Sequence, residues 1–127
     1  MALTTQDFVT AAKAEINECS IQEASEKLQQ GALALDVREP QEFMQAHLPS
    51  AVDVPRGVLE FRVDAHPKLQ DKDQEILVYC QAGGRGALAT KTLQDMGFTR
   101  VTNMLGGFAA WSEAGFEQTK DPAEWNE

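Results

Sequence analysis

The sequence predicts a single α/β domain in which a central, mainly parallel β-sheet is covered by helices on both faces. Short apolar runs of the length of buried strands recur along the chain, at residues 32–37, 51–54 and 75–79, and a further strand is expected at 101–104. Segments with helical spacing or helix-capping residues separate these runs, and this alternation is typical of a parallel sheet. The chain has 127 residues, a length that suits one domain.

The N-terminal part predicts an extra helix, a short strand and a second helix. An apolar helical face is formed by residues spaced four apart: Phe8, Ala12 and Ile16. The first helix, expected over residues 5–16, should pack this face on the domain, and a short strand is expected near residues 18–20. Ser20 and Glu23 have the spacing of a capping box, so a second helix should follow and end at Gly31.

The middle of the chain predicts two strands, each followed by a short helix. The run at 32–37 should be a strand of the buried sheet, and Pro40 should open a short helix in the loop that follows. The second run, 51–54, ends at Pro55. A further helix is expected over residues 58–63.

The C-terminal half contains the strongest strand signal, at residues 75–79, and completes the domain. A helix is expected over 85–96, a strand over 101–104 and a short helix over 108–114. The polar segment after Gly115 is expected to fray. The chain is therefore divided into an N-terminal helical extension, a domain and a polar C-terminal tail, at residues 1–17, 18–116 and 117–127.

The overall charge limits the classes of partner. A net charge of −9 and a pI of about 4.6 argue against nucleic acid and anionic membranes, so an anionic substrate needs a local positive field. The chain lacks an apolar stretch of the ~20 residues that span a membrane. Its first residues lack the pattern of a signal peptide, so we expect a cytoplasmic location. No cysteine or histidine cluster has zinc spacing, and we expect neither a metal nor a cofactor.

The most informative segment is residues 79–86. Cys80 falls at the carboxyl end of the strongest predicted strand, directly before a helix, which is where ligands bind in parallel sheets. Half of the eight residues are Gly or Ala, so the backbone N–H groups can turn inward around one point. Together with the N-terminus of the next helix they would form an anion-binding cradle, in which a thiolate or persulfide anion on Cys80 is stabilised.

The two cysteines have different sequence settings. Cys19 precedes a helix without a small-residue loop, and we interpret it as structural. A core cysteine would not need the glycines and the arginine that follow Cys80, so we interpret Cys80 as a nucleophile. A disulfide between the two is disfavoured by the expected reducing compartment.

The Cys80 segment resembles the active-site loop of the rhodanese family, in which a cysteine is followed by a small cradle that ends in an arginine. Three other segments are similar to motifs of that family and occur in the expected order, at residues 36–43, 46–55 and 106–111. The resemblance covers about residues 19–115. It implies a rhodanese-like domain, with the N-terminal helix outside it.

This resemblance implies a sulfurtransferase that needs no cofactor. Cys80 attacks the outer sulfur of thiosulfate, a persulfide or a polysulfide, and carries it as a persulfide to a thiol, cyanide or protein acceptor. The implied active-site loop consists of Gln81, Ala82, Gly83, Gly84, Arg85 and Gly86. The implied supporting residues are Asp36, Arg38 and Arg56.

Two other functions stay open at this point. The first is a non-catalytic module that binds a partner protein, although inactive modules usually lose the cysteine that this chain keeps. The second is a phosphatase or arsenate reductase. Related enzymes of those classes have five residues between the cysteine and the arginine, whereas four separate Cys80 from Arg85. The shorter loop suits a single sulfur atom, so we favour the sulfurtransferase.

The supporting residues each have more than one interpretation. Asp36 is expected to pair with Arg85 or Arg38 and to fix the loop. Arg85 either binds substrate or holds the Cys80 loop in place through an ion pair, and we favour the second role. Arg38 either lines the pocket or pairs with Glu42. Arg56 is a candidate for the pocket rim, with a solvated side chain as the simpler interpretation.

The loop departs from the family pattern in two ways. Family members that favour thiosulfate often carry basic residues where this chain has Gln81 and Ala82, so we expect weak thiosulfate binding and better transfer from a persulfide or polysulfide. Gly86 stands where serine or threonine is common. Outside the loop, His47 is expected to be a structural histidine bonded to nearby backbone rather than a general base.

Overall fold

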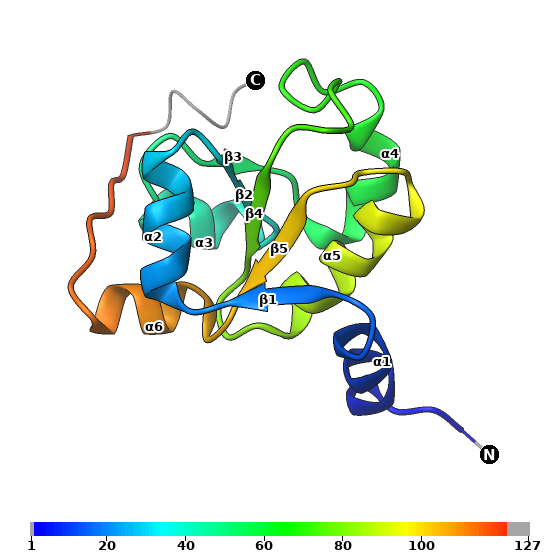
Figure 1. The fold of residues 1–127 in the computed structure, drawn as a ribbon. Coiled ribbons are helices and arrows are strands. Elements are labelled where there is room, and N and C mark those ends of the chain that lie inside the picture. Colours follow the sequence, from blue (N-terminus) through cyan, green and yellow to red (C-terminus); the bar gives the residue numbers. More distant parts are fainter. Residues whose placement is uncertain (1, 122–127) are drawn as a thin grey trace.

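A computed structural model describes residues 2–121 and contains a five-stranded parallel β-sheet (Figure 1). The strands β1 to β5 are Asn17–Cys19, Leu33–Asp36, Val52–Asp53, Ile76–Tyr79 and Val101–Met104. Their order in the sheet is β1-β5-β4-β2-β3, and every adjacent pair is parallel. This architecture confirms the predicted α/β fold.

Six α-helices are described, and five of them cover the two faces of the sheet (Figure 1). Helices α1 to α6 are Thr5–Lys13, Ile21–Gln29, Pro40–Gln45, Leu59–Val63, Gly84–Asp95 and Gly107–Glu113, and a 3₁₀ turn, Arg56–Val58, precedes α4. The predicted capping box opens α2, because Ser20 Oγ accepts from the Glu23 N–H and the Glu23 carboxylate accepts from the Ser20 N–H. No helix within residues 2–121 is long and apolar enough to cross a bilayer.

Strand β4 shows why the apolar run within residues 75–79 is not interrupted by polar residues. Its side chains alternate between two cores. Ile76 and Val78 face the core under α4 and α5, as does Cys80 just after the strand, whereas Leu77 and Tyr79 face the core under α2, α3 and α6. Because both faces are covered, every position of β4 is buried, and the strand is apolar throughout apart from the tyrosine hydroxyl.

Helix α1 lies at the β1 edge, beside the start of α5 (Figure 1). Val9 and Ala12 are its buried residues, and they pack on Ala87 of α5. Phe8 is 54% exposed, so its predicted place on the buried face is wrong. Neighbouring residues of a helix are about 100° apart, and the contact with α5 selects Val9 instead.

The segment after α6 is packed as far as residue 119, so the expected fraying after Gly115 is wrong there. The Phe116 ring stacks on Trp111 with 4.7 Å between centroids, and the Trp111 indole N–H donates to the Glu117 carbonyl at 2.7 Å. His47 and Thr119 exchange two backbone hydrogen bonds of 2.9 and 2.8 Å. The rest of the predicted tail, residues 122–127, lies outside the described residues.

Candidate active site

Cys80 lies directly after β4, at the carboxyl edge of the sheet, and its thiol is free. The side chain is only 1% exposed. The Gly83 N–H donates to Cys80 Sγ at 3.0 Å. Gly83 has φ of +123°, a conformation that glycine adopts readily, and it immediately precedes α5. The loop thus aims a backbone donor and a helix N-terminus at the sulfur, an arrangement that stabilises an anion.

The loop is held from one side by the start of α6. The Phe108 N–H donates to the Cys80 carbonyl at 2.7 Å, and the Ala109 N–H donates to the Gln81 carbonyl at 3.0 Å. A Cβ at Gly107 would lie 2.5 Å from the Cys80 carbonyl oxygen, so only glycine allows this approach. The Gly106-Gly107 turn and the Cys80 loop therefore form one unit.

The position of Asn103 explains why this chain has glycine at position 86, where serine or threonine is common in the family. A Cβ at this position would lie 2.3 Å from Asn103 Oδ1, so a serine or threonine could not be accommodated without movement of Asn103. Asn103 is fully buried in β5, and its Nδ2 donates to Glu18 Oε2 at 2.9 Å and to the Gly83 carbonyl at 3.4 Å. The sequence reasoning missed Asn103, because a polar residue in the expected strand 101–104 gives no sign of its partners.

Arg38 forms a buried ion pair with Asp36. Their side chains are 3% and 0% exposed, and Arg38 Nη2 and Nε donate to the carboxylate at 2.8 and 3.0 Å. Arg38 also donates to Gln81 Oε1 at 3.2 Å and to the Ala46 carbonyl at 2.7 Å, and its guanidinium lies 4.5 Å from the Phe108 ring centroid. Burial opposes the charge, but the bonds to Asp36 outweigh it and raise the pKa of Arg38.

Arg85 binds Glu42 of α3 rather than Asp36. Its two terminal nitrogens donate to the two carboxylate oxygens at 2.7 and 3.1 Å. These hydrogen bonds lower the pKa of Glu42, so the pair stays charged at neutral pH. Of the two pairings proposed for Asp36, the one with Arg38 is present, and the alternative Arg38–Glu42 pair is not formed. Arg85 ties the loop to α3.

Arg56 is the one supporting residue that the structure places elsewhere. Its guanidinium pairs with Glu60 at 3.1 Å and donates to Thr92 Oγ1 at 3.3 Å. It lines a hollow of about 230 Å³ between α1 and α5. Arg56 does not line the pocket beside Gln81, and its place at the rim of an active-site pocket stays a prediction.

A pocket of about 450 Å³ opens beside Gln81. Its lining consists of Arg38, Glu42, Gln45, Ala46, Gln81, Phe108, Ser112 and Gln118. The two charged members already have partners of opposite charge. The remaining polar surface is amide and hydroxyl, so this pocket offers hydrogen bonds without an uncompensated positive charge.

The chain matches the model of the rhodanese-like domain over residues 20–114. It is a member of the rhodanese-like family. The "Sulfurtransferase" of Allochromatium vinosum is 31% identical over 79% of this chain and 92% of that protein, and thiosulfate sulfurtransferase 16 of Arabidopsis thaliana is 39% identical over 76% and 87%. A solved structure from Rhodopseudomonas palustris, described as a protein of unknown function and possible tyrosine phosphatase, is 31% identical with a TM-score of 0.84, over 92% of this chain and 95% of that one.

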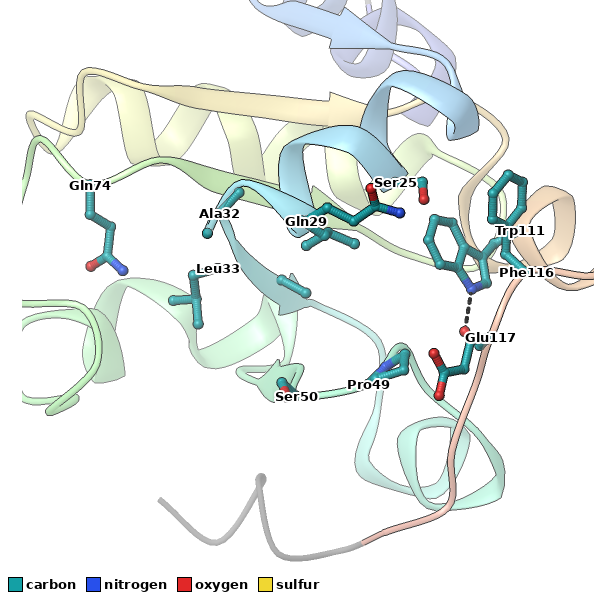
Figure 2. Close-up of a pocket in the computed structure, with 13 residues that line it drawn as sticks. Ser25, Gln29, Ala32, Leu33, Pro49, Ser50, Gln74, Trp111, Phe116 and Glu117 are labelled. Atoms are coloured by element: carbon teal, nitrogen blue, oxygen red, sulfur yellow. Dashed lines mark hydrogen bonds between the residues drawn. The ribbon is translucent and has the colours of Figure 1, made fainter.

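This rhodanese-like domain has a second hollow, of about 610 Å³, to which no residue of the Cys80 loop contributes. Figure 2 shows that Ser25 and Gln29 line one side and Pro49 and Glu117 another, with the Trp111 indole between them. Its lining contains one ionisable side chain, Glu117, and no cysteine. Within residues 2–121, no group of three or more His, Cys, Asp or Glu side chains is arranged to hold a metal ion.

Two residues of this domain have the structural settings that we expected. His47 Nδ1 is 2.8 Å from the Phe43 carbonyl, and its ring stacks on Phe43 with 3.7 Å between centroids. Cys19 is buried in the core under α2 and α6, and burial raises the pKa of its thiol to about 11. Cys19 is therefore a neutral thiol at physiological pH and a poor nucleophile.

Asp53 of this domain predicts a pH-dependent stability. It pairs in register with Asp36, is 6% exposed, and its Oδ1 has no hydrogen-bond partner. Burial and the charge of Asp36 raise its pKa to about 8. In the unfolded chain the Asp53 carboxyl has an ordinary pKa of about 3.9. The folded state holds the proton more tightly, so its stability is greatest below that pH and falls as the pH rises toward 8.

We therefore expect Asp53→Asn to remove this loss. Relative to the wild type, the variant should gain stability by on the order of 2 kcal/mol between pH 5 and pH 7, and the difference should level off above pH 8. Urea unfolding at pH 5, 7 and 9 measures it. A difference that is constant across these three values would contradict the assignment.

Proposed function

We propose that this chain is a sulfurtransferase in which Cys80 accepts a sulfane sulfur as a persulfide and transfers it to a thiol or cyanide. The proposal rests chiefly on the free Cys80 thiol, whose Sγ receives the Gly83 N–H at 3.0 Å beside the start of α5. The names of the similar proteins support the reaction class. We also propose a cytoplasmic setting, in which a reactive thiol stays reduced.

The proposed reaction is a double displacement without net oxidation. The Cys80 thiolate attacks the outer sulfur of the donor, a new S–S bond forms, and the bond between that sulfur and the rest of the donor breaks. Sulfite leaves from thiosulfate, and a thiolate leaves from a persulfide. An acceptor thiolate or cyanide then attacks the terminal sulfur, and Cys80 leaves as the thiolate. The Gly83 N–H and the start of α5 would hold the negative charge in each state.

The charges around the loop support a persulfide or polysulfide as the better donor. Thiosulfate carries two negative charges, whereas the positive charges of Arg38 and Arg85 are already matched by Asp36 and Glu42. Gln81 and Ala82 add no charge. A Michaelis constant for thiosulfate in the low micromolar range would contradict this preference.

Gln81→Lys is expected to improve thiosulfate as a donor. The new ammonium group would supply the uncompensated positive charge that the pocket lacks, and we expect kcat/KM for thiosulfate to rise roughly three- to tenfold at low salt. The gain should shrink as ionic strength increases, because the added charge is partly exposed. Gln81→Met is the matched control, and an equal gain in both variants would remove the electrostatic explanation.

Intact-mass measurement tests the proposed function. After incubation with thiosulfate or with glutathione persulfide, the protein should gain about 32 Da on the Cys80 peptide, and cyanide should reverse the gain. Gain from the persulfide alone would support the donor preference. If a folded, reduced protein gains no sulfur from either donor, the proposal fails and a non-catalytic binding module becomes the better interpretation.

A phosphatase or arsenate reductase is the second candidate, because the similar protein from R. palustris is described as a possible tyrosine phosphatase. The four residues between Cys80 and Arg85 argue against it, since a tetrahedral oxyanion needs a wider cradle. The engagement of Arg85 with Glu42 also argues against it, because that guanidinium is not free to bind an oxyanion. Turnover of a phosphate ester or of arsenate would reverse the preference.

A further inference from the structure

We propose that helix α1, which lies outside the segment that matches the family, positions the Cys80 loop through Lys13, Glu18 and Asn103 and through Val9. The inference rests on the proposed role of Cys80 as the reacting thiol. Two separate contacts connect α1 with the loop, one polar and one apolar. Both end on residues that set the position of the Gly83 N–H.

The polar contact is a chain of hydrogen bonds. Lys13, in the last turn of α1, binds Glu18 Oε2 at 2.6 Å, and the same oxygen accepts from Asn103 Nδ2 at 2.9 Å. Asn103 Nδ2 also lies 3.4 Å from the Gly83 carbonyl. The Gly83 N–H completes the path with its bond to Cys80 Sγ. The path therefore runs from the surface of α1 to the sulfur through side chains on two paired strands.

Asn103 has one orientation that fits its surroundings. Its Nδ2 faces two acceptors, Glu18 Oε2 and the Gly83 carbonyl, so this end of the amide must be the NH₂ group. Its Oδ1 is buried without a partner and fills the space that the missing side chain of Gly86 leaves. An unpartnered buried oxygen costs free energy. The bond to Glu18 is the stronger of the two that hold the amide in place.

The apolar contact supports the first turn of α5. Val9 Cγ2 lies 3.7 Å from the point where a Cβ on Gly84 would be, so the valine packs directly on the helix start. Val9 and Ala12 also pack on Ala87, one turn further along. Gly84 follows Gly83 immediately, so the apolar contact of Val9 and the polar contact of Asn103 both act on the backbone directly after the Gly83 N–H.

This placement predicts a defect that depends on pH. If the α1 contacts are weakened, the Gly83 N–H and the start of α5 shift relative to Cys80 Sγ, and the thiolate loses stabilisation. Alkylation requires a thiolate, so the reaction of Cys80 should slow at neutral pH when its donors move away, and the difference from the wild type should shrink as the pH rises. Asp36, Arg38, Glu42 and Arg85, which surround the loop, are unchanged by a variant at Glu18. The variant does remove the negative charge of Glu18 and leaves Lys13 unpaired, and both changes alone would favour the thiolate, so neither can produce the expected slowing.

Glu18→Ala tests the proposal, with Glu15→Ala as the matched control. Glu15 also forms an ion pair from this region to α5, with Lys91 at 3.1 Å, but that pair does not reach the loop. The rate at which iodoacetamide alkylates the Cys80 peptide is measured from pH 6 to 10 in both full-length variants. We expect Glu18→Ala to be about three- to tenfold slower at pH 7 and within twofold of the wild type at pH 10, and Glu15→Ala to be unchanged.

Equal slowing of Glu18→Ala at every pH, or no slowing at all, would overturn the proposal. Glu18→Gln keeps an acceptor for Asn103 and should recover most of the lost rate, whereas a general loss of fold would not be rescued in this way. Alkylation requires no sulfur donor. A wild-type protein that reacts with iodoacetamide but never gains sulfur would therefore refute the proposed function alone. The positioning inference would still be tested by the alkylation rates of the Glu18 variants.

Discussion

Cys80→Ser is expected to abolish sulfur loading while leaving the fold intact. A serine hydroxyl is not ionised at neutral pH and forms no stable bond to sulfane sulfur, so transfer should fall by at least about a thousandfold. The serine oxygen can still accept the Gly83 N–H that now binds Sγ. For this reason the free energy of unfolding should change by about 1 kcal/mol or less.

Cys19→Ser is the control, and it should give the opposite result. Cys19 is 5% exposed and lies among apolar side chains, so the new hydroxyl would be buried away from water. We expect a loss of roughly 1–3 kcal/mol of stability, with sulfur loading per folded molecule unchanged. Mass spectrometry and urea unfolding on both variants measure the two effects separately. Loss of loading in Cys19→Ser at full stability would contradict the assignment of Cys80 as the sole carrier.

The elements that the sequence predicts well are those specified by neighbouring residues. The three consecutive apolar residues Ile76, Leu77 and Val78 can be buried on alternating sides only in a covered strand, and β4 contains all three. The capping box of Ser20 and Glu23 is likewise local. Such signals need no knowledge of the rest of the chain.

The parts that the sequence does not predict depend on residues far apart in the chain. Arg85 and its partner Glu42 are separated by 43 positions, and Asn103 and Glu18 by 85. Charge alone cannot decide whether Arg85 pairs with Asp36 or Glu42, because the choice depends on where α3 packs. Asn103 falls within a short strand of mixed polarity, and its role is visible only once Gly86 is placed beside it.

Arg38→Met is expected to destabilise the domain strongly, because it leaves the Asp36 carboxylate buried without its cationic partner. Asp36 is 0% exposed and would keep the Arg38 backbone N–H, at 2.9 Å, but would lose the guanidinium. Removing one partner of a buried ion pair typically costs about 3–5 kcal/mol. Arg85→Met removes a similar pair near the loop, but the side chains of that pair are 38% and 33% exposed, and its loss should cost about 1 kcal/mol or less.

Urea unfolding of the two variants at pH 7 tests this difference, and a second variant separates charge from packing. In the double variant that combines Asp36→Asn with Arg38→Met, neither charge of the pair remains buried, so much of the lost stability should return. A purely steric defect of the introduced methionine side chain would instead persist in the double variant. If Arg38→Met and Arg85→Met lower the free energy of unfolding equally, burial does not make the Asp36–Arg38 pair the more important of the two for stability.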